Sequence, residues 1–126
     1  LYDELSCREN LVFLSHVRSD NHSGEIDQWL QKVGLTSRSN HPFGKLSTGQ
    51  RQRLRLAAAL FHQPDILLLD EPGSNLDSDG EAVVASIAHY FNQPDKLLVI
   101  ASNNPKELDL CEKVFSIQDG EFARSA

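Results

Sequence analysis

The sequence predicts an α/β fold in which a small helical part precedes a part that alternates strands and helices. Three observations lead to this prediction. Apolar side chains recur at helical spacing through the start of the chain, as in residues 6–17. Continuous apolar runs at 66–69 and 97–101 are typical of parallel strands buried on both faces. A segment with helical spacing, 78–91, separates these runs, as the crossover between parallel strands requires.

In the helical part, local signals mark where each helix begins and ends. Ser6 and Glu9 have the spacing of a capping box. Gly34 is placed to end the second helix, and Pro64 follows the third. Trp29 lies beside the apolar face of the second helix, which indicates packing rather than ligand binding. The expected helices span about 6–16, 25–33 and 49–61.

In the second part, the two apolar runs should be parallel neighbours joined through one helix. Ser78 and Glu81 match a second capping box at the start of that helix. Asn104 followed by Pro105 predicts an N-cap with proline at the first helical position. Asp119 and Gly120 predict a terminal hairpin. The expected elements are a helix near 78–91 and strands near 66–69, 97–101, 114–117 and 121–124.

Composition excludes several classes of function. The chain has 126 residues and a net charge of −6, which argues against a general affinity for nucleic acid. Cys7 and Cys111 belong to no motif and are most simply two reduced thiols. The 5 histidines lack metal-ligand spacing, so we expect no zinc site. No apolar run approaches the roughly 18–20 residues that a membrane span needs.

Two segments suggest chemistry. Residues 46–53 form a polar, glycine-containing turn that opens a helix, and a helix N-terminus attracts anions such as phosphate. Residues 66–72 form an apolar strand that ends in two adjacent carboxylates, Asp70 and Glu71. Carboxylates at the end of a buried strand suit Mg²⁺ and an attacking water. The alternative is that the second segment is only a strand end turning into a loop.

Asp70 follows Ser47 by 23 positions, and in this order the two segments resemble the signature motif and the Walker B segment of an ATP-binding cassette (ABC) ATPase, the nucleotide-binding domain of an ABC transporter. The resemblance implies the C-terminal part of a P-loop NTPase-type parallel sheet with an appended helical subdomain. No Gly-x-x-x-x-Gly-Lys-Ser/Thr loop occurs in the chain, so we expect it to begin past the phosphate loop and the glutamine loop. By this resemblance, residues 1–62 form the helical subdomain and residues 63–126 the second half of the ATPase core.

The resemblance also implies roles for the strand-end residues. Asp70 corresponds to the aspartate that holds Mg²⁺. Glu71 corresponds to the catalytic glutamate that polarises or deprotonates the attacking water. Asn103 falls where the family usually has a histidine that contacts the γ-phosphate. An asparagine amide donates a hydrogen bond but carries neither a proton nor a positive charge, so its catalytic contribution is open.

The resemblance implies further roles for residues of the signature turn and of the loop that follows the strand at 66–69. Asp77 ends a match to the D-loop, Ser74–Asp77, and could equally be a plain helix N-cap. Three arginines, Arg51, Arg53 and Arg55, cluster directly after the signature turn (residues 47–50), and for Arg51 and Arg55 a plain solvated helix face is the alternative to a functional role. Ser47 could act simply as the cap of the third helix, and both of its roles can hold at once. The residues expected to contact the γ-phosphate bound on the opposing subunit are Ser47, Thr48, Gly49 and Gln50, with Thr48 in place of the more common glycine.

The resemblance implies ATP and Mg²⁺ as cofactors and ATP hydrolysis that powers transmembrane transport. The implied partners are a second nucleotide-binding domain, in a head-to-tail dimer, and a transmembrane permease that holds the protein on the cytoplasmic face of the membrane. Alternatives are a soluble ABC ATPase that acts on ribosomes or DNA, and an inert fragment or dimerisation module. Without a phosphate loop, the isolated chain should neither bind ATP tightly nor hydrolyse it, and exposed sheet edges should make it self-associate.

Overall fold

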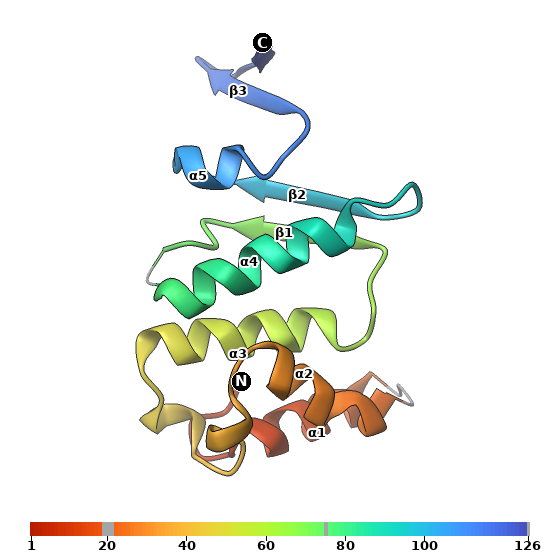
Figure 1. Ribbon diagram of the computed structural model, residues 1–126, viewed down its shortest axis with the longest axis vertical. Coiled ribbons are helices and arrows are strands. Elements are labelled where there is room, and N and C mark those ends of the chain that lie inside the picture. Colours follow the sequence, from red (N-terminus) through yellow and green to blue (C-terminus); the bar gives the residue numbers. More distant parts are fainter. Residues whose placement is uncertain (19–21, 75, 126) are drawn as a thin grey trace.

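The computed structural model describes residues 1–18, 22–74 and 76–125. Helices α1 to α3 lie at one end, α4 lies over strands β1 and β2, and the β3–β4 hairpin lies at the other end (Figure 1). The elements are α1 Cys7–Val17, η1 His22–Glu25, α2 Ile26–Lys32, η2 Thr36–Arg38, η3 Phe43–Lys45, α3 Thr48–Leu60, β1 Ile66–Asp70, α4 Ser78–Phe91, β2 Leu97–Ala101, α5 Pro105–Leu108, β3 Val114–Gln118 and β4 Glu121–Ser125, where η marks a 3₁₀ helix. The predicted α/β order of elements is therefore confirmed.

The helical half closes around its own core. Ser6 caps α1 through the predicted box, since its Oγ accepts from the Glu9 N–H at 3.1 Å and Glu9 Oε2 accepts from the Ser6 N–H at 2.7 Å. Trp29 packs against this core, as predicted. None of the helices described is long and apolar enough to cross a membrane. The buried residues of the core include Cys7, Leu11, Leu30, Leu35, Leu54 and Phe61.

Helix α2 ends at a glycine, as the sequence predicts. Gly34 has φ +69°, the left-handed conformation that glycine adopts without strain. The Gly34 N–H donates to Gln31 O at 3.0 Å and the Leu35 N–H donates to Leu30 O at 2.8 Å. These two bonds define a Schellman motif, which satisfies carbonyls that the end of the helix would otherwise leave unpaired.

Strands β1 and β2 are parallel neighbours, as predicted, with Ile66 opposite Leu97 and Asp70 opposite Ala101. Helix α4 joins them and covers one face of the pair, where its Val84 packs with Leu67 of β1. Helix α3 also contributes side chains to this second core, so it packs against the helical half on one side and against the α/β half on the other. The buried members of the second core are Leu56, Leu60, Leu67, Leu69, Val84, Ile87 and Phe91.

The prediction that the first strand is buried on both faces is wrong for this chain. Leu67 and Leu69 are buried beneath α4, but Ile66 is 61% exposed and Leu68 is 71% exposed. Within the described residues β1 pairs with β2 alone, and no helix lies over the other face of the pair. The apolar run indicates that both faces of β1 are suited to burial. Burial of the second face also requires another layer of structure packed against it.

The C-terminal hairpin, β3 with β4, forms a second two-stranded sheet. Asp119 and Gly120 both have positive φ, 51° and 78°, as the predicted two-residue turn requires. Asn104 caps α5 by accepting from the Lys106 N–H at 3.0 Å, with Pro105 at the first helical position, as predicted. Both cysteines are free thiols, and burial raises the pKa of each.

Candidate functional site

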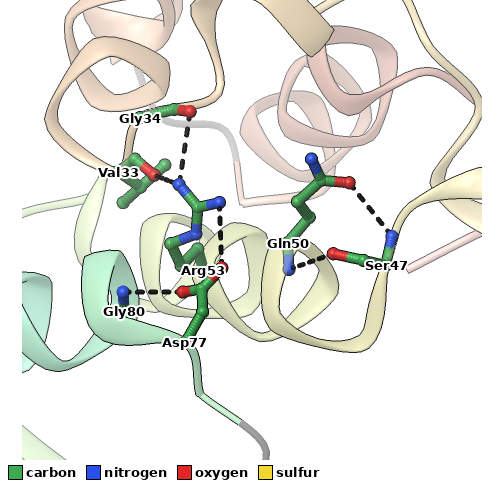
Figure 2. Close-up of polar contacts among 7 residues, drawn as sticks. All are labelled: Val33, Gly34, Ser47, Gln50, Arg53, Asp77 and Gly80. Atoms are coloured by element: carbon green, nitrogen blue, oxygen red, sulfur yellow. Dashed lines mark hydrogen bonds and ion pairs between the residues drawn. The ribbon is translucent and has the colours of Figure 1, made fainter.

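The signature turn is the N-terminus of α3. Ser47 Oγ accepts from the Gln50 N–H at 3.2 Å, and the Ser47 N–H donates to Gln50 Oε1 at 3.0 Å, which makes a capping box (Figure 2). The cap leaves the Ser47 hydroxyl proton and the Gln50 side-chain NH₂ free to donate. Ser47 and Thr48 are exposed. This first turn therefore presents hydrogen-bond donors at the positive end of a 13-residue helix, an arrangement that suits an anion.

Gly49 is buried, unlike its neighbours Ser47 and Thr48. A Cβ atom built on Gly49 would lie 3.0 Å from Asp77 Oδ2 and 3.2 Å from Asp77 Cγ. The missing side chain thus lets the Asp77 carboxylate lie directly against the signature turn. Asp77 is the residue through which the structure brings the signature turn and the segment before α4 together.

Asp77 caps α4, and the predicted capping box at Ser78 and Glu81 is wrong. The Asp77 carboxylate accepts from the Gly80 N–H at 2.8 Å, so Ser78 is already the first helical residue. Aspartate is as good an N-cap as serine, so the predicted helix 78–91 is confirmed with Asp77 as its cap, the alternative role considered for this residue. Asn75, inside the expected D-loop, lies outside the described residues.

The carboxylates Asp70 and Glu71 lie at the carboxyl end of β1, with Asn103 just beyond the end of β2, and all three are exposed. The Glu71 N–H donates to Ala101 O at 2.8 Å, which extends the pairing of the two strands by one residue. Glu71 has φ +46°, a conformation uncommon for a non-glycine residue and often found at functional sites. The sheet therefore brings these three side chains to one edge.

The donor set at this edge fits Mg²⁺. Across residues 1–18, 22–74 and 76–125, no group of three or more His, Cys, Asp or Glu side chains could hold a metal ion on its own. Mg²⁺ takes only one or two carboxylates and completes its octahedron with waters and ligand oxygens. Asp70 and Glu71 supply exposed carboxylates of this kind. Figure 1 shows the N-terminal ends of α3 and α4 and the carboxyl ends of β1 and β2 on the same side of the molecule.

Arg53 is a residue near the candidate site that the sequence analysis did not single out. Its side chain is buried and lies between the end of α2 and Asp77 (Figure 2). The sequence position of Arg53 could have indicated that its side chain is buried, because Arg53 lies on the same helical face as Leu56, Ala57 and Leu60, which are all buried. A charged residue in an apolar stripe signals a partner.

The other two arginines of α3 lie over the ring of Phe43, with guanidinium carbons 5.6 Å from its centroid for Arg51 and 5.7 Å for Arg55. Arg55 is exposed, in line with a solvated face. Arg51 is only half-exposed and donates to Gly44 O, so the solvated interpretation is wrong for Arg51.

Glu107 of α5 is a second residue that the sequence analysis did not single out. It is 6% exposed, and its Oε2 has no partner among the described residues. A Cβ atom on Gly73 would lie 2.0 Å from Glu107 Oε1, so the carboxylate fills the space beside the loop that follows Glu71. The contact joins the segment after β1 to the segment after β2.

Comparisons with known proteins identify relatives along nearly the whole chain. The chain is 30% identical over 125 residues to the ABC transporter ATP-binding protein NatA of Bacillus subtilis, covering 96% of this chain and 51% of NatA. It is 32% identical over 130 residues to the lipoprotein-releasing system ATP-binding protein LolD of Hahella chejuensis, covering 100% and 56%. The chain thus spans about half the length of these relatives.

A solved structure described as an inward-facing, metal-chelate type ABC transporter shares the fold. It superimposes with a TM-score of 0.76 over 95% of this chain and 51% of that one, at 23% identity. The family model described as ABC transporter matches residues 1–74, more than half of this chain. With the signature turn and the strand-end carboxylates in place, this match shows that the chain belongs to the ABC transporter ATP-binding family.

Proposed function

We propose that the complete protein containing this chain binds and hydrolyses ATP as the nucleotide-binding subunit of an ABC transporter. The observation that supports this most is the separation of two half-sites. An anion-binding helix terminus lies at Ser47, in the helical half, while the Mg²⁺-type carboxylates lie at the sheet edge. A head-to-tail dimer would join the helix terminus of one subunit to the nucleotide held by the other.

At the sheet edge, we assign Asp70 to Mg²⁺ and Glu71 to the attacking water. Bound Mg²⁺ would neutralise charge on the phosphate oxygens. Glu71 has a left-handed backbone, and its side chain is exposed, so its carboxylate would be accessible to accept a proton from water. Asn103 would donate a hydrogen bond to the γ-phosphate without supplying charge.

At the helix terminus, we assign the phosphate contact to the opposing subunit's nucleotide. The Ser47 hydroxyl and the Gln50 amide remain donors after the capping box has formed. The Thr48 and Gly49 N–H groups belong to the first turn of α3, where helical partners are lacking. Asp77 serves as a helix cap and, in this proposal, as part of the seam between subunits.

The complete protein would be organised as its relatives' names suggest. NatA and LolD are both described as ATP-binding proteins, and we propose a permease as the membrane partner and the cytoplasmic face as the location. We also propose the division into residues 1–62 and 63–126, although α3 packs on both cores. The isolated chain, which has no phosphate-loop sequence, should be inactive.

An ATPase assay of the complete protein beside this chain tests the proposal. The complete protein should hydrolyse ATP in the presence of Mg²⁺ and lose activity when Mg²⁺ is chelated. The chain alone should show neither hydrolysis nor tight binding of a fluorescent ATP analogue. Asp70→Asn should raise the Mg²⁺ concentration needed for activity, and Asp109→Asn, another exposed aspartate of the same half, serves as the control. A complete protein without Mg²⁺-dependent ATPase activity would overturn the proposal.

A further inference from the structure

Arg53 joins the end of one helix to the cap of another. Its Nη1 donates to Val33 O at 2.8 Å and to Gly34 O at 3.3 Å, the carbonyls at the C-terminal end of α2. Its Nη2 lies 3.5 Å from Asp77 Oδ2 (Figure 2). The other oxygen of Asp77 accepts from the Gly80 N–H at 2.8 Å. One guanidinium and one carboxylate thus connect α2, α3 and α4.

The charges match the helix ends that they contact. A cation is favourable at the negative C-terminal end of α2, and an anion is favourable at the positive N-terminal end of α4. The Arg53 side chain is 7% exposed, whereas that of Asp77 is 45% exposed. Loss of the Asp77 charge would leave a buried cation without its anion, while loss of Arg53 would leave a carboxylate that water can solvate.

The same carboxylate contacts the signature turn. Gly49 lies against Asp77, and Arg53 follows Gly49 by one helical turn, on the same face of α3. Asp77 is therefore held between Gly49 and Arg53. Any movement of Arg53 would change how the signature turn lies against the start of α4.

We propose that Arg53 is a positioning residue that, through Asp77, holds the signature turn and the segment before α4 in one fixed arrangement. The effect on ATP turnover rests on the proposed function, since both segments would face the other subunit. In the proposed function, the phosphate loop of that other subunit would hold most of the nucleotide. A displaced signature turn should therefore lower kcat and leave KM for ATP nearly unchanged.

The test uses Arg53→Gln and Asp77→Asn in the complete protein, singly and together. Asparagine keeps the N-cap acceptor, so Asp77→Asn removes the charge alone. Arg53→Gln should lower kcat by up to about 10²-fold, the range for displaced positioning groups. Arg53→Lys should recover part of this loss. Arg55→Gln, which removes an exposed arginine from the same helix, is the matched control.

Amide hydrogen exchange at Gly80 and in the first turn of α4 supplies a readout that does not depend on ATPase activity. Both single variants should speed exchange there, and the double variant should add little to either, because the residues act as a pair. Additive effects on exchange, or a kcat for Arg53→Gln equal to that of Arg55→Gln, would overturn the inference. If the complete protein hydrolyses no ATP, the proposed function fails. The hydrogen-exchange rates of the two single variants and the double variant then decide whether Arg53 positions the signature turn.

Discussion

The helical half and the α/β half of the chain differ in how completely they bury their apolar side chains. In the helical half Leu11, Leu54 and Phe61 are all 0% exposed, and α1 and α3 begin at capping boxes. In the α/β half Ile66 and Leu68 are 61% and 71% exposed. The helical half thus has a fully buried core, although Phe13 and Val17 of α1 are exposed, whereas the α/β half leaves one apolar sheet face without cover among the described residues.

The difference shows how the proposed chemistry is distributed. The helical half presents its donors from the start of α3, a helix whose Leu54 and Ala57 are buried in the core. The α/β half presents Asp70, Glu71 and Asn103 at the carboxyl ends of two strands, and one face of this strand pair has no helix over it among the described residues. Changes at the exposed strand-end side chains of the α/β half should therefore affect activity with little effect on stability, whereas changes at the buried side chains of the helical half should mainly lower stability.

Glu71→Gln in the complete protein should have the largest effect. It keeps the shape and hydrogen bonding of the side chain but removes the carboxylate, so hydrolysis should fall by roughly 10²–10⁴-fold, as for loss of a general base. ATP binding should persist, with a stabilised dimer. Because Glu71 is exposed, the free energy of unfolding should change by less than about 0.5 kcal/mol. Hydrolysis at the parental rate would show that the catalytic assignment is wrong.

Two leucines compare the halves directly. In this chain, Leu54→Ala removes a side chain that is 0% exposed and should lower the free energy of unfolding by about 2–5 kcal/mol. Leu68→Ala removes one that is 71% exposed and should change it by less than about 0.5 kcal/mol. Urea denaturation of both variants measures the difference. Equal losses would mean that the exposed sheet face is covered in solution.

Self-association tests the open face itself. Leu68 and its register partner Val99 lie side by side on that face, and exposed apolar strands favour pairing with another chain. Light scattering should show this chain associating as its concentration rises. Replacing Leu68 and Val99 with threonine should reduce the association, because threonine keeps β propensity but is polar. A stable monomer of the unaltered chain would contradict the prediction.

Two glycine substitutions compare the cost of backbone strain alone with the cost of strain together with a steric contact. Gly34→Ala places alanine at φ +69°, which should cost roughly 1–2 kcal/mol, and its Cβ would lie 2.8 Å from Arg53 Nη1. Gly120→Ala places alanine at a similar φ of +78°, but its Cβ would have no neighbouring atom within 4 Å among the described residues. Thermal denaturation should therefore show the greater loss for Gly34→Ala, in the helical half. Equal losses would indicate that Arg53 adjusts without cost.

The sequence could predict features that depend on neighbouring residues. The box at Ser6, the glycine stop at Gly34 and the hairpin at Gly120 all follow from local spacing. Asp70 and Glu71 were predictable as strand-end carboxylates because the apolar run places them there. The roles assigned to them stay predictions.

Features that depend on tertiary placement could not be predicted. Arg53 meets Asp77 only because α3 packs against α4, and Glu107 meets Gly73 only because α5 folds back beside the loop after β1. Burial of the second face of β1 also depends on a layer outside the strand. The apolar run alone cannot say whether that layer is present.

Asn103→His should have a smaller effect on hydrolysis than Glu71→Gln, and it tests the departure from the family pattern that the sequence itself reveals. Asn103 is exposed at the same edge as Glu71, so a histidine fits there and would add a group able to carry charge. If the proposed site is slowed by the amide, the ATPase rate of the complete protein should rise by up to about tenfold, equivalent to 1.4 kcal/mol in the barrier. The gain should grow as pH falls toward the histidine pKa. Asn104→His, which replaces the neighbouring cap of α5, is a control that should show no such gain. An unchanged rate for Asn103→His would mean that the amide already suffices, while the family assignment would stand.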